Sequence, residues 1–271
     1  MLDLEKTKNM IPKKIHFCWL SDNPYPKKIQ RCIDSWKEKL PDYEIVKWDL
    51  KRFPLEKNIW VKEAFEAKKY AFAADYIRLY ALYTEGGIYL DSDVEVLKPF
   101  NDLLDLPYFL GRENGSCPQF VEAAVMGCSP KTNWIKDCLA YYDGQHFIGS
   151  IEHQKGKPLP QVISKILSEK YGIIDIDSPL NFNRQNAQIQ VFPTCYFSPK
   201  NYISLKIQVT SNTYSIHHFA GSWAPLKDHF LNRIEGLFGK KIQTIFWLIL
   251  RNPLLNIKGL LRLFKERRIW W

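Results

Sequence analysis

Residues 71–98, which read AFAADYIRLYALYTEGGIYLDSDVEVLK, decide the fold class of this 271-residue chain. The segment 71–85 is predicted to be a helix, and Gly86-Gly87 predicts its end, because glycine readily adopts the left-handed conformation. Residues 88–91 then form a short apolar strand that runs directly into an Asp-Ser-Asp sequence. Acidic residues at the carboxyl end of a buried strand indicate an α/β sheet with a ligand site at that edge.

The sequence before this segment predicts a parallel sheet. Residues 14–20, KIHFCWL, are predicted to be a buried strand, and residues 43–48 a second strand. Between them, residues 26–40 carry apolar side chains at helical spacing. A strand, a helix and a further strand in this order predict a parallel pair joined by a right-handed crossover.

Helices and strands continue to alternate along the rest of the chain, which predicts the α/β class. The further predicted helices are 58–69, 133–142 and 159–170, and the further predicted strands are 94–97, 121–127, 189–192 and 214–218. Two polar, irregular stretches, 143–158 and 175–188, are predicted to be mobile loops.

Asp91 and Asp93 are the residues that indicate chemistry. Two carboxylates at one strand end repel each other and are costly to desolvate, and a divalent cation removes that cost. Oxygen ligands suit Mn²⁺ or Mg²⁺, which also bind phosphate oxygens of a substrate. A simple turn is the alternative interpretation, because Asp and Ser are common where strands end.

Three segments of the chain resemble glycosyltransferase family 32. Residues 71–98 resemble its DXD-region signature, IPKKIHFCWL at 11–20 resembles its first strand, and HHFAGSW at 217–223 resembles its C-terminal donor-site motif. The family includes yeast-type initiating mannosyltransferases and bacterial capsule and lipopolysaccharide enzymes, and it is similar to clostridial glucosylating toxins. The resemblance implies a GT-A type nucleotide-sugar-binding fold with a mixed central sheet. It also implies a retaining sugar transfer.

The same resemblance implies roles for individual residues. Trp19 would stack on the base or border it, and Asp75 and Arg78 would contact ribose and diphosphate or sugar. Tyr89 would lie near the diphosphate. Asp91 would reach ribose and sugar, and the metal through water, while Asp93 would bind the metal directly. Asp91 and Asp93 are therefore the predicted catalytic pair.

The C-terminal motif contains two adjacent histidines, and the resemblance implies that one is a metal ligand. We predict His218 as this ligand, with Ser222 and Trp223 closing over the diphosphate as further donor-binding residues. If residues 214–218 form a strand, His217 and His218 face opposite sides. The sequence by itself leaves the choice between them open.

Other interpretations exist for several of these residues. Asp75 and Arg78 could form only a surface ion pair on one helix face, and Trp19 could be core packing. A retaining enzyme could use a carboxylate nucleophile, for which Glu113 and Glu122 are available. We favour same-face attack instead, in which the leaving diphosphate accepts the acceptor's proton.

The net charge of +9 is concentrated in the last residues of the chain. Residues 237–271 contain eight basic residues and one acidic residue, so residues 1–236 are nearly neutral. We predict a catalytic domain at 1–236 and a basic, amphipathic helical tail at 237–271. Apolar residues at helical spacing, neighbouring cations and a terminal Trp pair predict that this tail associates with an anionic membrane surface.

Other features of the sequence suggest a cytoplasmic protein on the inner face of the plasma membrane. The first ten residues do not resemble a signal peptide, and the longest apolar run, 245–250, is too short to cross a bilayer. No two of the six cysteines have CxxC spacing, so we expect reduced thiols rather than a zinc or redox site.

The sequence therefore predicts a metal-dependent hexosyltransferase. Its donor would be a nucleotide-sugar, with UDP-hexose preferred and GDP-mannose possible. Its acceptor would be a glycan or a lipid-linked molecule in cell-surface polysaccharide synthesis. A metal-dependent phosphodiesterase or nuclease is one alternative, and a non-enzymatic membrane or nucleic-acid binding module is another. We expect no nucleic-acid partner, because the body of the chain carries little net charge.

Overall fold

The computed structural model describes residues 10–114, 120–147 and 157–220. All of them belong to the first of two units into which the chain divides, Met1–Trp223, and the second unit is Ala224–Trp271. The predicted tail and the predicted domain boundary between residues 236 and 237 lie outside the described residues. Both therefore stay predictions.

The described residues form an alternating series of helices and strands. The strands are β1 Lys14–Cys18, β2 Glu44–Trp48, β3 Gly87–Leu90, β4 Val94–Val96, β5 Tyr108–Arg112, β6 Val121–Cys128, β7 Ile173–Asp175, β8 Ile189–Val191 and β9 Ser215–His217. The α-helices are α2 Lys27–Lys39, α3 Ile59–Glu66, α4 Tyr70–Glu85, α5 Asn133–Ala140, α7 Leu159–Lys170 and α8 Thr194–Phe197. Three short 3₁₀ turns are η1 Leu55–Lys57, η2 Asn101–Leu103 and η3 Pro179–Asn181.

The main sheet has five strands in the order β2-β1-β3-β6-β5. β1 pairs in parallel with both β2 and β3, whereas β6 pairs antiparallel with β3 and β5. The predicted α/β fold with a mixed central sheet is therefore confirmed, as is the predicted opening of strand, helix and parallel strand. Two smaller ladders, β4-β9 and β7-β8, complete the described strands.

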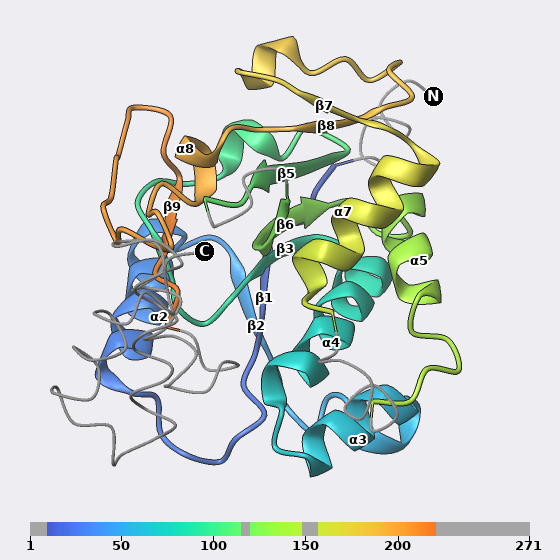
Figure 1. Ribbon diagram of the computed structural model, residues 1–271. Helices are drawn as coiled ribbons and strands as arrows, with labels where there is room; N and C mark the ends of the chain where they lie inside the picture. The colour runs from blue at the N-terminus through green and yellow to red at the C-terminus, as the bar shows by residue number, and fades with distance from the viewer. Residues whose placement is uncertain (1–9, 115–119, 148–156, 221–271) are drawn as a thin grey trace, which may run out of the picture. The chain divides into compact units, whose positions relative to one another are not determined.

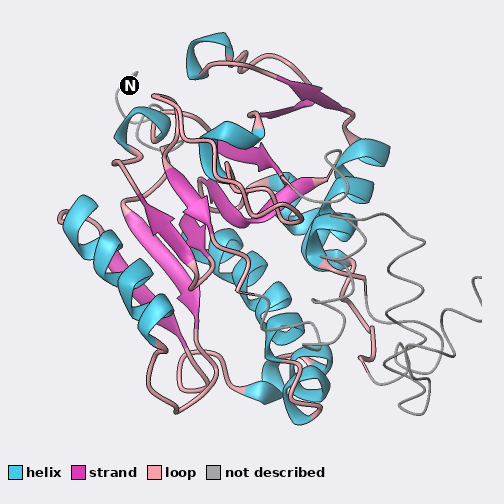
Figure 2. Cartoon of the chain, turned by 60° about the vertical axis from the view of Figure 1, so that its left-hand side comes forward, coloured by secondary structure: helices cyan, strands magenta, loops and turns pink. Residues whose placement is uncertain are grey.

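Helices cover both faces of the main sheet (Figures 1 and 2). The alternation along β3 shows how the core is divided: Ile88 and Leu90 pack in the cluster that includes α2, and Tyr89 packs in the cluster that includes α4. Successive strand residues face opposite sides, so one short strand contributes to both halves of the core. Tyr89 is thereby brought to the same side of the sheet as α4.

The end of α4 is fixed by the predicted glycine pair. Gly86 and Gly87 both have positive φ, 65° and 98°. A Cβ on Gly86 would lie 2.7 Å from Pro130 Cδ, and one on Gly87 would lie 2.8 Å from the carbonyl oxygen of Lys14. Only glycine allows the chain to leave the helix here and enter the centre of the sheet within two residues.

Some elements differ from the sequence-based prediction. β5 and β7 were not predicted, although each pairs with the next strand along the chain, β6 and β8 respectively. The helix predicted at 133–142 ends at Ala140, and the strand predicted at 14–20 ends at Cys18. A search of the described residues for a helix long and apolar enough to cross a membrane finds none. The five cysteines among them are free.

Candidate functional site

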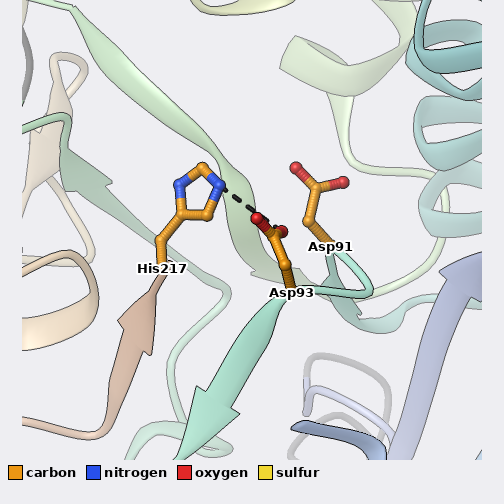
Figure 3. Close-up of side chains that lie close together, drawn as sticks. All are labelled: Asp91, Asp93 and His217. Atoms are coloured by element: carbon orange, nitrogen blue, oxygen red, sulfur yellow. Dashed lines mark ion pairs between the residues drawn. The ribbon is translucent and has the colours of Figure 1, made fainter. Parts of the chain in front are cut away.

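Asp91 and Asp93 lie directly after β3, at the edge of the sheet where the sequence predicted a ligand site. The short strand β4 follows, and β9 pairs with it so that Val94 lies opposite His217. This pairing brings one side chain from near the end of the described chain to the Asp pair. Ligand atoms of Asp91, Asp93 and His217 all lie within 4.8 Å of one another (Figure 3).

The His217 ring lies between carboxylates on both sides. Its Nε2 is 3.6 Å from Asp93 Oδ1, and its Nδ1 is 3.1 Å from Glu122 Oε1. Burial lowers the pKa of His217, but the charges of Glu122, Asp93 and Asp91 raise it to about 9. Without a metal ion, the protonated ring therefore supplies the positive charge that these carboxylates require.

The prediction of His218 as the metal ligand is not supported by this geometry. His218 Nε2 lies 2.8 Å from Glu95 Oε2, and its backbone N–H donates to the carbonyl oxygen of Asp93 at 3.1 Å. Adjacent residues at a strand end point to opposite sides, and here His217 points to the Asp pair. Of the two histidines, His217 is therefore the one whose ring lies within reach of the Asp pair.

Asp75 and Arg78 form a buried ion pair that extends to the partly exposed Asp91. Arg78 is 5% exposed and Asp75 is 8% exposed, so they are not the surface pair that the sequence left open. Arg78 Nη2 lies 3.1 Å from Asp75 Oδ1 and 3.2 Å from Asp91 Oδ1. Arg78 Nη1 also donates to the carbonyl oxygen of Ala123 at 2.8 Å. One guanidinium therefore connects α4, the end of β3 and β6.

The charge balance of this cluster shifts both carboxyl groups. Burial raises the pKa of Asp75 to about 7; the charge of Arg78 opposes this rise and that of Asp91 adds to it. Burial, with the charge of Asp93, also raises the pKa of Asp91, against the effects of Arg78, His217 and a hydrogen bond from Tyr89. The site therefore holds more carboxylate than its own cations neutralise easily.

Tyr89 fixes the position of Asp91. Its hydroxyl donates to Asp91 Oδ1 at 3.1 Å, and its ring lies 4.6 Å from the guanidinium carbon of Arg78. The ring itself is buried in the core. Tyr89 thus reaches the predicted donor site through its hydroxyl, which orients the carboxylate of Asp91.

Asp93 is held by the segment that follows β9. Its Oδ2 accepts a hydrogen bond from the backbone N–H of Ala220 at 2.6 Å. Phe219, the residue before Ala220, has a positive φ of 50°, and its ring centroid lies 4.1 Å from that of His217. A turn after β9 therefore wraps around Asp93.

Trp19 lies in the loop after β1 and is half-buried. Its indole N–H donates to the carbonyl oxygen of Asn23 at 3.0 Å, and its ring packs edge-on against Tyr25 at 4.9 Å. These contacts do not test the predicted role of Trp19 beside the base of the nucleotide donor, which stays a prediction. Ser222 and Trp223 lie outside the described residues.

Glu122 is a site residue that the sequence analysis named only as a possible nucleophile. It is 1% exposed, and its Oε1 lies 3.1 Å from His217 Nδ1, so its carboxylate is shielded from solvent. The sequence did contain a signal for a structural role: Glu122 is the one acidic residue in the otherwise apolar strand Val121–Cys128, and a buried carboxylate needs a partner. For Glu113, burial and the charge of Glu122 raise the pKa to about 7, which His217 opposes.

The donor set fits a hard divalent cation. Two carboxylates and one imidazole could provide three ligand atoms for such an ion. Among the described residues this is the one group of three or more acidic, histidine or cysteine side chains close enough to share an ion.

Comparisons with known proteins agree with this chemistry. Residues 26–110 match the family model described as "Glycosyltransferase sugar-binding region containing DXD motif". That segment of the chain is therefore similar to the DXD-containing region of glycosyltransferases, in agreement with the resemblance to family 32. Asp75, Arg78, Tyr89, Asp91 and Asp93 all lie within the matched segment, and His217 lies beyond it.

Several relatives have similar sequences over part of their length. Subversion of eukaryotic traffic protein A of Legionella pneumophila is 34% identical over 36% of this chain and 19% of its own. Inositol phosphoceramide mannosyltransferase 3 of Schizosaccharomyces pombe is 33% identical over 43% of this chain and 33% of its own. Mannosyl phosphorylinositol ceramide synthase SUR1 of Saccharomyces cerevisiae is 30% identical over 51% of this chain and 37% of its own. The chain thus spans about a fifth to two fifths of the length of these relatives.

Two solved structures also have a similar arrangement of the chain. The PaToxG glycosyltransferase is 20% identical, with a TM-score of 0.46, over 60% of this chain and 70% of its own. The galactosyltransferase LgtC, solved with donor and acceptor sugar analogues, is 14% identical, with a TM-score of 0.43, over 77% of this chain and 87% of its own.

Proposed function

We propose that this chain is a metal-dependent hexosyltransferase that transfers a sugar from a nucleotide-sugar donor to an acceptor hydroxyl. The observation that carries the proposal is the convergence of Asp91, Asp93 and His217 at the carboxyl edge of the sheet, inside and beside the matched DXD region. Arg78 lies next to them, buried and ion-paired. This combination of oxygen ligands and a guanidinium suits a diphosphate.

Each side chain has a proposed task. Asp93 and His217 hold the metal ion, and Asp91 contributes directly or through water. When bound, Mn²⁺ or Mg²⁺ neutralises the charge that develops on the departing diphosphate. Arg78 binds the diphosphate or sugar and favours the ionised form of Asp91, while Tyr89 orients Asp91 through its hydroxyl.

The donor is proposed to be a UDP-hexose, with GDP-mannose as the other candidate. Two of the relatives carry mannosyl transfer in their names, which supports testing mannose beside glucose and galactose. The acceptor is proposed to be a glycan or a lipid-linked molecule used in cell-surface polysaccharide synthesis. Both relatives are also named for an inositol phosphoceramide, which supports a lipid-linked acceptor.

The transfer is proposed to retain the anomeric configuration of the donor, by same-face attack. Glu122 does not suit the task of a nucleophile, because its carboxylate is buried and faces His217. In same-face attack the leaving diphosphate accepts the proton of the acceptor hydroxyl. NMR of the newly formed linkage is the measurement, and an inverted product would exclude this mechanism.

The decisive experiment incubates the full chain and its Asp93→Asn variant with a panel of UDP- and GDP-sugars in Mn²⁺. We expect donor hydrolysis or transfer with one sugar by the original chain and none by the variant, and chelation with EDTA should stop the reaction. Oligonucleotides in parallel wells test the phosphodiesterase alternative. Cleavage of the oligonucleotide, with all nucleotide-sugars left intact, would refute the proposed function.

A further inference from the structure

Glu122 is a buried carboxylate within the apolar strand β6. It is 1% exposed, and every residue of this strand is buried. Its Oε1 accepts a hydrogen bond from the backbone N–H of Ala124 at 3.0 Å, while its Oε2 has no hydrogen-bond partner among the described residues. A carboxylate in such a place requires a positively charged neighbour to offset the cost of its burial.

The neighbour that meets this requirement is His217. Its Nδ1 lies 3.1 Å from Glu122 Oε1, although the ring N–H is not aligned for a hydrogen bond. The opposite ring nitrogen, Nε2, faces Asp93 (Figure 3). The imidazole therefore stands between a carboxylate that belongs to the proposed metal site and one that lies behind it.

A histidine with its two nitrogens in such different surroundings has a defined role in a metal site. When Nδ1 carries the proton and donates it to a carboxylate, Nε2 keeps a free lone pair directed at the metal. Such a partner also restricts rotation of the ring and makes the ligand nitrogen more basic. Ser198, whose buried Oγ has no hydrogen-bond partner among the described residues, lies near the same carboxylate.

We propose that Glu122 is a positioning residue that holds His217 with its proton on Nδ1 and with Nε2 directed at Asp91 and Asp93. Glu122 itself touches neither donor nor metal; it acts through the histidine. The inference rests on the proposed metal-dependent function, and its test separates the two.

The first measurement is Mn²⁺ affinity of the full chain, without nucleotide, by electron paramagnetic resonance. We expect Glu122→Gln to weaken Mn²⁺ binding by about tenfold to a hundredfold, because the side chain keeps its size but loses its charge. Ser164→Ala is the matched control. Ser164 supports the start of the same strand, β6, because its Oγ accepts a hydrogen bond from the backbone N–H of Val121, and it makes none of the contacts described for His217. It should leave Mn²⁺ affinity unchanged.

The second measurement is the tautomer of His217, read from ring ¹⁵N shifts of the Mg²⁺-loaded full chain and assigned with His217→Ala. We expect protonated Nδ1 and unprotonated Nε2 in the original chain. This measurement needs no change at Glu122, so a ring protonated on Nε2 would overturn the inference even if Glu122→Gln does not fold.

Two results would overturn the inference: unchanged Mn²⁺ affinity in folded Glu122→Gln, or a His217 ring protonated on Nε2. Asp93→Asn distinguishes failure of the proposed function. If that variant binds Mn²⁺ as well as the original chain, the metal site itself is wrong. If it loses Mn²⁺ while Glu122→Gln does not, the site stands and only the positioning role is wrong.

Discussion

The candidate site has two sides that are built in different ways. One side is local in sequence: α4, β3 and the turn after it supply Asp75, Arg78, Tyr89 and both DXD carboxylates within a short segment. The other side consists of His217 and Glu122, which come from β9 and β6 and meet the first side only through strand pairing. The difference shows that the acidic residues of the candidate site can be recognised from a sequence motif. The residues that complete the site can be recognised only once the register of the strand pairs is known.

The largest expected effect is on the local side, at Asp93. Asp93→Asn should reduce turnover by at least 10²–10³-fold, because loss of charge stabilisation at a leaving group costs about 3–4 kcal/mol. The measurement is donor turnover in saturating Mn²⁺, with circular dichroism to confirm the fold. Near-full turnover would show that the local side does not carry the metal.

Arg78 tests whether the local side is held together by its buried charges. Arg78→Met should destabilise the protein by about 3–5 kcal/mol, because the buried Asp75 and the partly exposed Asp91 would lose their shared cation. The free energy of unfolding in urea measures this. Lys37→Met is the control, since Lys37 is an exposed residue whose ion pair with Asp34 lies on the surface of α2.

A small effect of Arg78→Met, similar to that of Lys37→Met, would mean that water compensates for the missing guanidinium. The buried network would then be a binding feature without a role in stability.

The remote side is tested by its two adjacent histidines. His217→Ala should weaken Mn²⁺ affinity more than Glu122→Gln does, because it removes one of three proposed ligands and not only the residue that orients it. His218→Ala should have little effect, since His218 faces Glu95. Titration of Mn²⁺ into each variant measures this, and the reverse order would restore the original choice of His218.

How much of this could be predicted from sequence depends on the same division. The end of α4 at Gly86, the strand after it and the DXD pair were all predicted, because each depends on neighbouring residues. β5 was not predicted, although it pairs with β6, the next strand along the chain. The choice between His217 and His218 was left open for a related reason: a strand was expected here, but which of its residues faces the Asp pair could not be read without its partner β4.

The pH dependence of metal binding offers a finer test of the remote side. The pKa of His217 is raised to about 9, above its ordinary value of 6.5, so its protonated form stabilises the metal-free protein below pH 6.5 and this contribution is lost as pH rises through about 9. Metal must displace that proton, so Mn²⁺ affinity should rise by about tenfold per pH unit between these values. In His217→Ala the slope should be much smaller, and an equal slope in both proteins would contradict the assignment.

The smallest expected effect on the site comes from the tail, which belongs to neither side. Truncation after Gly239 should leave Mn²⁺ affinity unchanged, because all the proposed ligand residues lie in the first unit of the chain.

The same truncation should reduce flotation with liposomes that contain anionic lipid, because each cation near such a surface contributes about 1 kcal/mol and residues 240–271 hold eight cations. Flotation measured over a series of liposomes with increasing anionic lipid separates the contribution of the cations, which should grow along the series, from that of apolar insertion, which should not. Equal flotation of both proteins would remove the membrane prediction, whereas a loss of Mn²⁺ affinity would show that the tail contributes to the site.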